Sequence, residues 1–169
     1  MNEDKVEPIK VFISSSQKEF ERLRKNLKTE IDDVELAYQK MLRAILVESK
    51  KGTSIQSDID EGLSDSAIYV GIFGQVYSEI TVEEFRKAYS RMMPVLIYRF
   101  RKNKRIKSVI RGRSNVDEFL RAEVKQYDIR IRGPFSNETA LIEAVITDLG
   151  FLIAKMVKES ANIRRTIGR

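Results

Sequence analysis

Three glutamates lie close to an expected helix start in residues 78–85, which read SEITVEEF. On a helical projection Glu84 flanks the apolar stripe next to Ala88, whereas Glu83 points more nearly to solvent. A carboxylate at the edge of the stripe can face a pocket and be partly desolvated. Desolvation would shift its pKa, as is common for carboxyls in functional sites. Glu84 is therefore a candidate for chemistry in such a pocket. Thr81 and Glu84 also have the spacing of a capping box, in which a helix-start carboxylate contributes about 1 kcal/mol. From the spacing alone, a helix cap is the better explanation of Glu84 than a residue of a functional pocket.

A run of three serines, Ser14, Ser15 and Ser16, follows the apolar stretch at 9–13. At a strand-to-helix junction, free backbone N–H groups and the positive helix end can hold a phosphate or a carboxylate. Ser16 and Glu19 have capping-box spacing, so simple N-capping is the alternative and the better explanation from spacing. The chain has neither a GxGxxG nor a GxxxxGK[ST] motif, so neither a dinucleotide fingerprint nor a P-loop is supported.

The residue types that are missing narrow the chemistry further. The chain of 169 residues has no cysteine and no histidine. This composition excludes disulfides, thiolate zinc sites, cysteine nucleophiles and histidine-based triads, and we expect no metal site. Any reaction must use carboxylates, hydroxyls, lysine, arginine and backbone dipoles.

The net charge of +6 comes from one segment, residues 99–113, which carries eight Lys or Arg and no acid. Such a segment can bind phosphates of a nucleotide, nucleic acid or lipid headgroup, with Arg101, Lys102, Lys104 and Arg105 as candidates. A solvated loop between a strand and a helix is the favoured alternative. Phe100 is its only aromatic residue, which argues against a nucleic-acid groove.

The elements that must position these residues alternate between strand and helix. Strands are expected at 9–13, 44–48, 67–73, 94–98 and 129–131, and helices at 16–31, 54–62, 81–89, 115–127 and 138–158. Residues 34–49 fit either a continued helix or a strand at 44–48, and the strand is favoured. Gly133-Pro134 is expected to mark a break after the last strand, which alternates with arginines as an edge strand does.

This order predicts an α/β fold of three layers with a mostly parallel five-stranded, flavodoxin-like sheet in the order 2-1-3-4-5. In such sheets the functional crevice lies outside the carboxyl ends of the strands, beside strand 1. Ser14–Ser16 should then lie close to the loop from Gly74 to Thr81. We expect one domain over 1–169, with a flexible start at 1–8 and a frayed end at 160–169. No signal peptide or membrane span is visible, so a cytoplasmic protein is expected.

One stretch of the chain reads VFISSSQKEFERLR at 11–24, and a second reads SDSAIYVGIFGQVYSEITVEEFRKAY at 64–89. Both resemble the TIR-like family catalogued as domain of unknown function 4062. The second has an Asp before an apolar strand, Gly and Tyr after it, and then Thr-x-x-Glu-aromatic. The family usually has Gly after the tyrosine and a longer loop, whereas Ser78 follows Tyr77 here.

That family is similar to TIR domains and nucleoside 2-deoxyribosyltransferases, in which a glutamate on the helix after the third strand contacts the ribose. The matching residue is Glu84. The resemblance implies cleavage or transfer at the N-glycosidic bond of NAD or a nucleoside, with no cofactor required. Glu84 would hold the ribose hydroxyls or act as nucleophile, Ser14 and Ser15 would line the pocket, and Tyr77 would stack on a base.

Two further functions stay open. A non-catalytic TIR-like signalling module would assemble with itself or with a separately encoded partner, and would show a shallow pocket and an exposed apolar patch. Phosphate or nucleic-acid binding through residues 99–113 is the third alternative.

Overall fold

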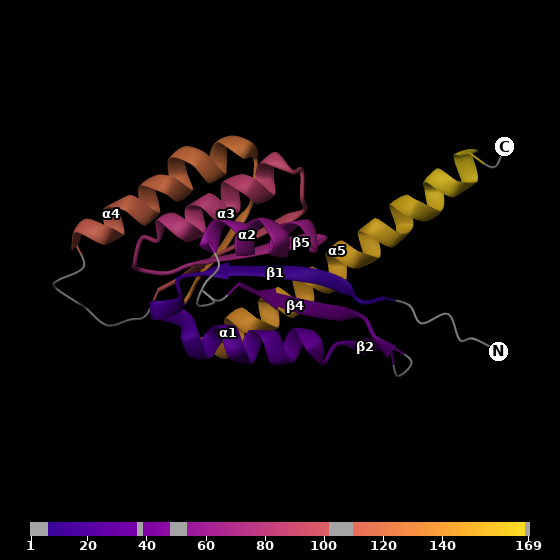
Figure 1. Ribbon diagram of the computed structural model, residues 1–169, viewed down its shortest axis with the longest axis horizontal. Helices are drawn as coiled ribbons and strands as arrows, with labels where there is room; N and C mark the ends of the chain where they lie inside the picture. The colour runs from indigo at the N-terminus through magenta and orange to yellow at the C-terminus, as the bar shows by residue number, and fades with distance from the viewer. Residues whose placement is uncertain (1–6, 37–38, 48–53, 102–109, 168–169) are drawn as a thin grey trace.

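The computed structural model describes residues 7–36, 39–47, 54–101 and 110–167, and it is a parallel α/β fold (Figure 1). The five strands of the main sheet are β1 (Ile9–Ser15), β4 (Leu42–Leu46), β5 (Ile68–Phe73), β6 (Val95–Phe100) and β7 (Ile131–Phe135). All neighbours pair in parallel in the order β4-β1-β5-β6-β7. The predicted order 2-1-3-4-5 is confirmed.

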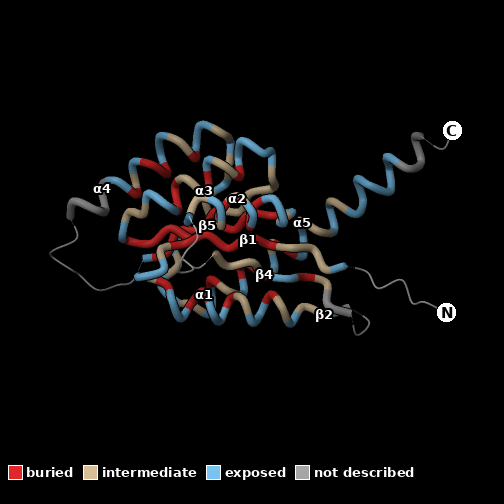
Figure 2. The backbone as a smooth tube through the Cα atoms, in the orientation of Figure 1, coloured by how far each residue is buried: buried red, intermediate tan, exposed pale blue. Residues whose placement is uncertain are grey.

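Helices cover both faces of this sheet, as Figure 1 shows. The helices α1 (Gln17–Asp32) and α5 (Glu138–Ile167) pack on one face, and α2 (Ile55–Ser64), α3 (Glu79–Ser90) and α4 (Ile110–Phe119) on the other. The strands β1 and β5 lie between the layers and are the most buried part of the chain (Figure 2). Successive residues of β1 face opposite layers: Val11 and Ile13 join the core with α1 and α5, whereas Phe12 joins the core with α2 and α3.

The segment that fitted both helix and strand is extended. Two short antiparallel strands, β2 (Glu35–Leu36) and β3 (Gln39–Lys40), precede β4, so the favoured strand is confirmed over 44–46. A contact from α1 helps to hold β4 in place: Asp32 Oδ1 accepts a hydrogen bond of 2.7 Å from the backbone N–H of Ala44. Residues 48–53 lie outside the described part of the chain.

The C-terminal third differs from expectation in three places. β7 starts at Ile131 and includes Gly133-Pro134, so the expected break there was wrong. Proline is tolerated because β7 is an edge strand, where one side of the backbone needs no ladder partner. The helix expected at 115–127 begins at Ile110 and ends in a π turn (Leu120–Val124) and a 3₁₀ turn (Lys125–Tyr127). α5 continues to Ile167 and extends away from the sheet (Figure 1). None of the helices in the described ranges is long and apolar enough to cross a membrane.

Candidate functional site

A cavity of about 300 Å³ opens at the carboxyl end of β1, where the switch point of the sheet was expected. It lies between the start of α1, the end of β4, the loop after β5 and the start of α3. Its lining consists of Ser15, Ser16, Gln17, Lys18, Arg24, Val47, Val76, Tyr77, Ser78, Ile80, Thr81 and Glu84. The loops after β1 and β5 therefore meet, as the sheet order predicted.

Glu84 lies in this cavity and is only 6% exposed. The Oγ of Ser14 donates a hydrogen bond of 2.5 Å to its Oε2. Burial raises the pKa of Glu84 from 4.5 to about 7, against the lowering effects of the Ser14 hydrogen bond and the charge of Arg24. Near neutral pH the carboxyl therefore exists as both acid and carboxylate.

The pleat of β1 explains why Ser14 and Ser15 have different partners. Ser14 points to the same face as Phe12 and reaches α3, whereas Ser15 points to the opposite face and reaches α1. Both are buried, and Ser15 lines the cavity. Ser14 contacts the carboxyl of Glu84 and is not part of the lining, although it was expected there.

Arg24 is a buried cation of the site that the sequence reasoning missed. Its Nη1 donates to the backbone carbonyl of Ser15 at 2.8 Å, and its Nη2 donates to the carbonyl of Val47 at 3.1 Å. The guanidinium thus ties the end of β1 to the chain that follows β4. Arg24 lies four residues after Phe20 on the buried stripe of α1 and is only 6% exposed. Its place on that apolar stripe is the feature of the sequence from which its burial could have been predicted.

Neither predicted capping box forms. Ser78 is the N-cap of α3 and accepts a hydrogen bond from the N–H of Thr81, so Thr81 lies inside the helix. Ser16 is the N-cap of α1 as expected, but its side chain makes no capping hydrogen bond. Both glutamates bind distant groups instead: Glu84 accepts from Ser14, and Glu19 accepts from the backbone N–H groups of Gln75 and Val76.

The remaining predicted residues separate into two groups. Tyr77 and Thr81 line the cavity with Glu84, whereas Gly74 lies under the carboxylate of Glu19 and is not part of the lining. Arg101 is likewise not among the lining residues and forms an ion pair of 3.1 Å with Asp117. Lys102, Lys104 and Arg105 lie outside the described residues.

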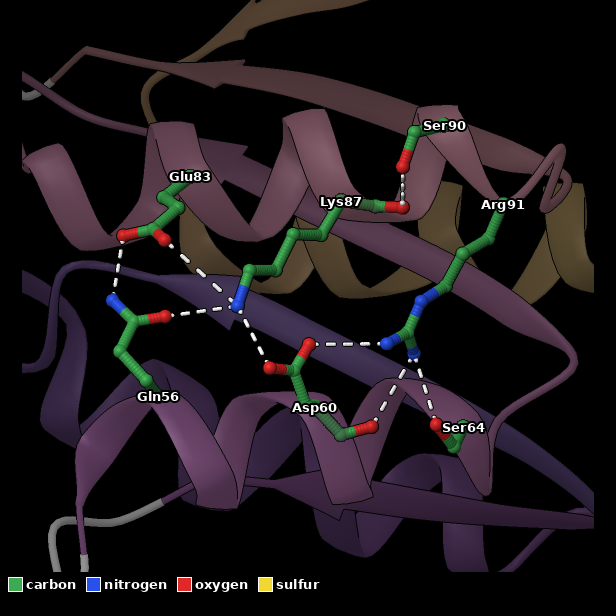
Figure 3. A network of polar contacts seen from close by, with 7 residues as sticks. All are labelled: Gln56, Asp60, Ser64, Glu83, Lys87, Ser90 and Arg91. Carbon is green, nitrogen blue, oxygen red and sulfur yellow. Dashed lines mark hydrogen bonds and ion pairs between the residues drawn. The ribbon is translucent and has the colours of Figure 1, made fainter.

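A polar network between α2 and α3 holds Glu83, the neighbour of Glu84 (Figure 3). Gln56 Nε2 donates to Glu83 Oε2 at 2.8 Å, and Lys87 Nζ lies 3.8 Å from Glu83 Oε1. Lys87 also donates to Asp60 at 3.0 Å. Glu83 is thus held in a partly exposed network on the α2 side, whereas Glu84 turns into the cavity.

The side chains of the cavity suit an organic ligand better than a metal ion. Across the described ranges, no cluster of three or more His, Cys, Asp or Glu is placed to hold a metal ion. The cavity lining offers one carboxyl, the hydroxyls of serine and threonine, two cations (Lys18 and Arg24) and an apolar wall. This set suits a polar ligand with one apolar face.

Comparison with known families agrees with the two sequence stretches noted above. The family described as Domain of unknown function (DUF4062) matches residues 10–150, which include β1 from its second residue, β5, α3 and all residues that line the cavity. The chain belongs to this family. No curated protein matches the chain. The DUF4062 match thus identifies the domain.

Proposed function

We propose that this DUF4062 domain binds a nucleotide or nucleoside in the cavity and cleaves or transfers at its N-glycosidic bond. The observation that carries the proposal is Glu84: a buried carboxyl, bonded to Ser14, in a cavity at the carboxyl edge of a parallel sheet. A carboxyl in this position can bind ribose hydroxyls or attack the anomeric carbon.

The lining matches the parts of such a ligand. Val76 and Ile80 are 49% and 43% exposed, and with Tyr77 they give an apolar wall on which a base can stack. Lys18 and Arg24 supply positive charge from α1, and a phosphate would be favoured beside them. A volume of about 300 Å³ is at the low end for small-molecule sites, so we expect it to enclose one nucleoside unit.

The proposed reaction needs only groups that the chain has. The bond between the anomeric carbon and the base nitrogen breaks, the electron pair leaves with the base, and positive charge develops on the sugar. Ionised Glu84 stabilises that charge, or forms an ester with the anomeric carbon, which water or a ring nitrogen of a free acceptor base then attacks, releasing the carboxylate. The resemblance of the family to TIR domains and nucleoside 2-deoxyribosyltransferases supports this role for Glu84. In those proteins the glutamate that contacts the ribose lies on the helix after the third strand, and α3 follows β5, the third strand of the main sheet along the chain.

The experiment is to incubate the purified protein with NAD and a panel of ribo- and deoxyribonucleosides and to follow the free base by chromatography. Because Glu84 has a pKa of about 7, we expect release to increase from pH 6 to pH 8. No release from any compound at high protein concentration would contradict the proposal.

A second candidate, self-association as a non-catalytic signalling module, is favoured by the end of α5. The C-terminal part of the helix projects from the domain (Figure 1), and from the middle of α5 onward Phe151, Val157 and Ile163 are 73%, 63% and 58% exposed. Contiguous apolar surface is typical of interaction sites, and association of this part of α5 with a second copy would bury these side chains. Light scattering on the parent and on Phe151→Ser would test it. A monomeric parent would contradict self-association.

A further inference from the structure

The loop between β5 and α3 forms one wall of the cavity without regular secondary structure. Val76, Tyr77 and Ser78 line the cavity from this loop, and Ser78 also caps the helix that carries Glu84. A wall built on a loop needs contacts that hold its backbone, because loops are otherwise the more mobile parts of a fold.

Glu19 of α1 holds the N–H side of this loop. Its Oε1 accepts a hydrogen bond of 2.7 Å from the N–H of Gln75, and its Oε2 accepts one of 3.0 Å from the N–H of Val76. Hydrogen bonds to an ionised carboxylate are stronger than those between neutral groups. The loop thus lies against a charged partner 56 and 57 residues away in the chain.

Gly74 is what lets this carboxylate approach. A Cβ atom at position 74 would lie 2.2 Å from Glu19 Oε2 and 2.3 Å from its Cδ, which is far inside van der Waals contact. Any side chain at this position would therefore push Glu19 away from the two N–H groups.

Arg99 holds the carbonyl side of the same stretch. Its Nη1 donates to the carbonyl of Phe73 at 3.0 Å and also to the carbonyl of Gly74. Arg99 is only 5% exposed, and its Nη2 forms an ion pair of 3.0 Å with Asp117 of α4. The peptide from 73 to 76 is consequently bound by a cation at its carbonyls and by an anion at its N–H groups.

We propose that Glu19 and Arg99 form a clamp on residues 73–76 and act as positioning residues for the cavity wall and for the start of α3. Neither residue would touch substrate. The catalytic consequence rests on the function proposed above, but the effect of the clamp on the loop can be measured without any activity.

The first test compares Glu19→Gln with Glu21→Gln by amide hydrogen exchange. The amide introduced by Glu19→Gln would present an N–H₂ group to one of the two backbone donors, whereas Glu21 is exposed on the same helix and pairs with Lys25. We expect exchange at Gln75 and Val76 to accelerate at least about tenfold in Glu19→Gln and to stay unchanged in Glu21→Gln. Equal exchange in Glu19→Gln and the parent would overturn the clamp.

The second test is a double-mutant cycle with Gly74→Ala and Glu19→Ala, read out by the denaturation midpoint. Gly74→Ala should lower the midpoint clearly in the parent and much less in the Glu19→Ala background, where the clash is removed. An equal loss in both backgrounds would overturn the proposal. If Glu19→Ala does not fold, Glu19→Asp, whose shorter side chain leaves room for the new methyl group, replaces it in the cycle.

A third measurement separates the clamp from the reaction. If the parent releases base, Glu19→Gln should raise KM and lower kcat while the pH midpoint of kcat stays that of Glu84. If the parent releases no base, the proposed function fails, and hydrogen exchange and the mutant cycle still decide whether the clamp exists.

Discussion

The hydroxyl of Ser14 donates to the carboxyl of Glu84 across 70 residues of sequence, with 2.5 Å between Oγ and Oε2. The contact joins the end of β1 to the first half of α3, and both side chains are buried. Burial raises the pKa of Glu84, and the hydrogen bond from the Ser14 hydroxyl offsets part of this increase. The result is a carboxyl in the cavity that titrates near neutral pH.

Removing that hydroxyl should raise the pKa of Glu84 further. Hydrogen bonds to charged groups contribute about 1.5–3 kcal/mol, and about 1.4 kcal/mol corresponds to one pKa unit. Ser14→Ala should therefore shift the midpoint up from about 7 by roughly one unit or more and lower base release at pH 7. The measurement is a ¹³C NMR titration of labelled glutamate carboxyls. Ser66→Ala, which removes a hydrogen bond to Gly62 outside the cavity, is the control and should leave the midpoint in place.

Glu84 should also make the domain less stable as the pH rises. Its folded pKa of about 7 lies above the ordinary value of 4.5, so the folded state binds more protons between these values than the unfolded state does. Stability from this group is then fully present below pH 4.5 and is lost as the pH rises to 7, by about 3 kcal/mol in total.

Glu84→Gln should remove this loss, since an amide of the same shape does not ionise. Urea unfolding at pH 5 and pH 8 should show a smaller decrease in the variant than in the parent. Glu83→Gln is the matched control, because Glu83 has a side chain that is 42% exposed. A decrease of the same size in Glu84→Gln and the parent would show that the carboxyl is not desolvated.

Arg24 should affect both stability and the pKa of Glu84. Arg24→Met leaves the carbonyls of Ser15 and Val47 without their guanidinium donors, which should cost about 1–3 kcal/mol of unfolding free energy. It also removes a positive charge that lowers the pKa of Glu84, so the midpoint should rise. Arg24→Lys should restore the charge but only part of the stability, since one ammonium lacks the planar fork. The comparison with Arg22→Met, at an exposed arginine of the same helix, separates this from general effects on α1.

The network of Figure 3 predicts two small shifts of opposite sign. The charge of Glu83 raises the pKa of Glu84, so Glu83→Gln should lower the NMR midpoint. Lys87→Met removes the cation beside Glu83 and should raise the midpoint. Shifts in the same direction for both variants would contradict this account. Unfolding free energies should change by about 1 kcal/mol or less, as is typical of partly exposed pairs.

The pattern of apolar stretches was enough to predict the sheet order and the buried side of α3. The apolar run at 67–73 predicted a buried strand, and all six residues of β5 are buried. Glu84 faces inward because it borders the stripe of Val82 and Phe85. The meeting of the serine loop with the 74–81 loop followed from topology alone, since carboxyl ends of parallel strands share one edge.

The sequence did not predict what the two capping-box glutamates bind. The spacings of Ser16 with Glu19 and of Thr81 with Glu84 satisfy the local rule, but both carboxylates bind tertiary partners instead. A rule that spans three residues has no access to donors 56 or 70 residues away. Arg24 was missed for a related reason, because charged residues on a buried stripe are usually assumed to reach solvent.

The most direct measurement of the central claim is base release by Glu84→Gln and Glu83→Gln, side by side with the parent, on whichever compound the parent cleaves. The two glutamates are neighbours on α3, but only Glu84 lines the cavity and bonds Ser14. The account predicts that Glu84→Gln loses at least about a hundredfold in rate, as removal of a transition-state contact does, whereas Glu83→Gln stays within about twofold. Equal activity in Glu84→Gln and the parent would contradict it.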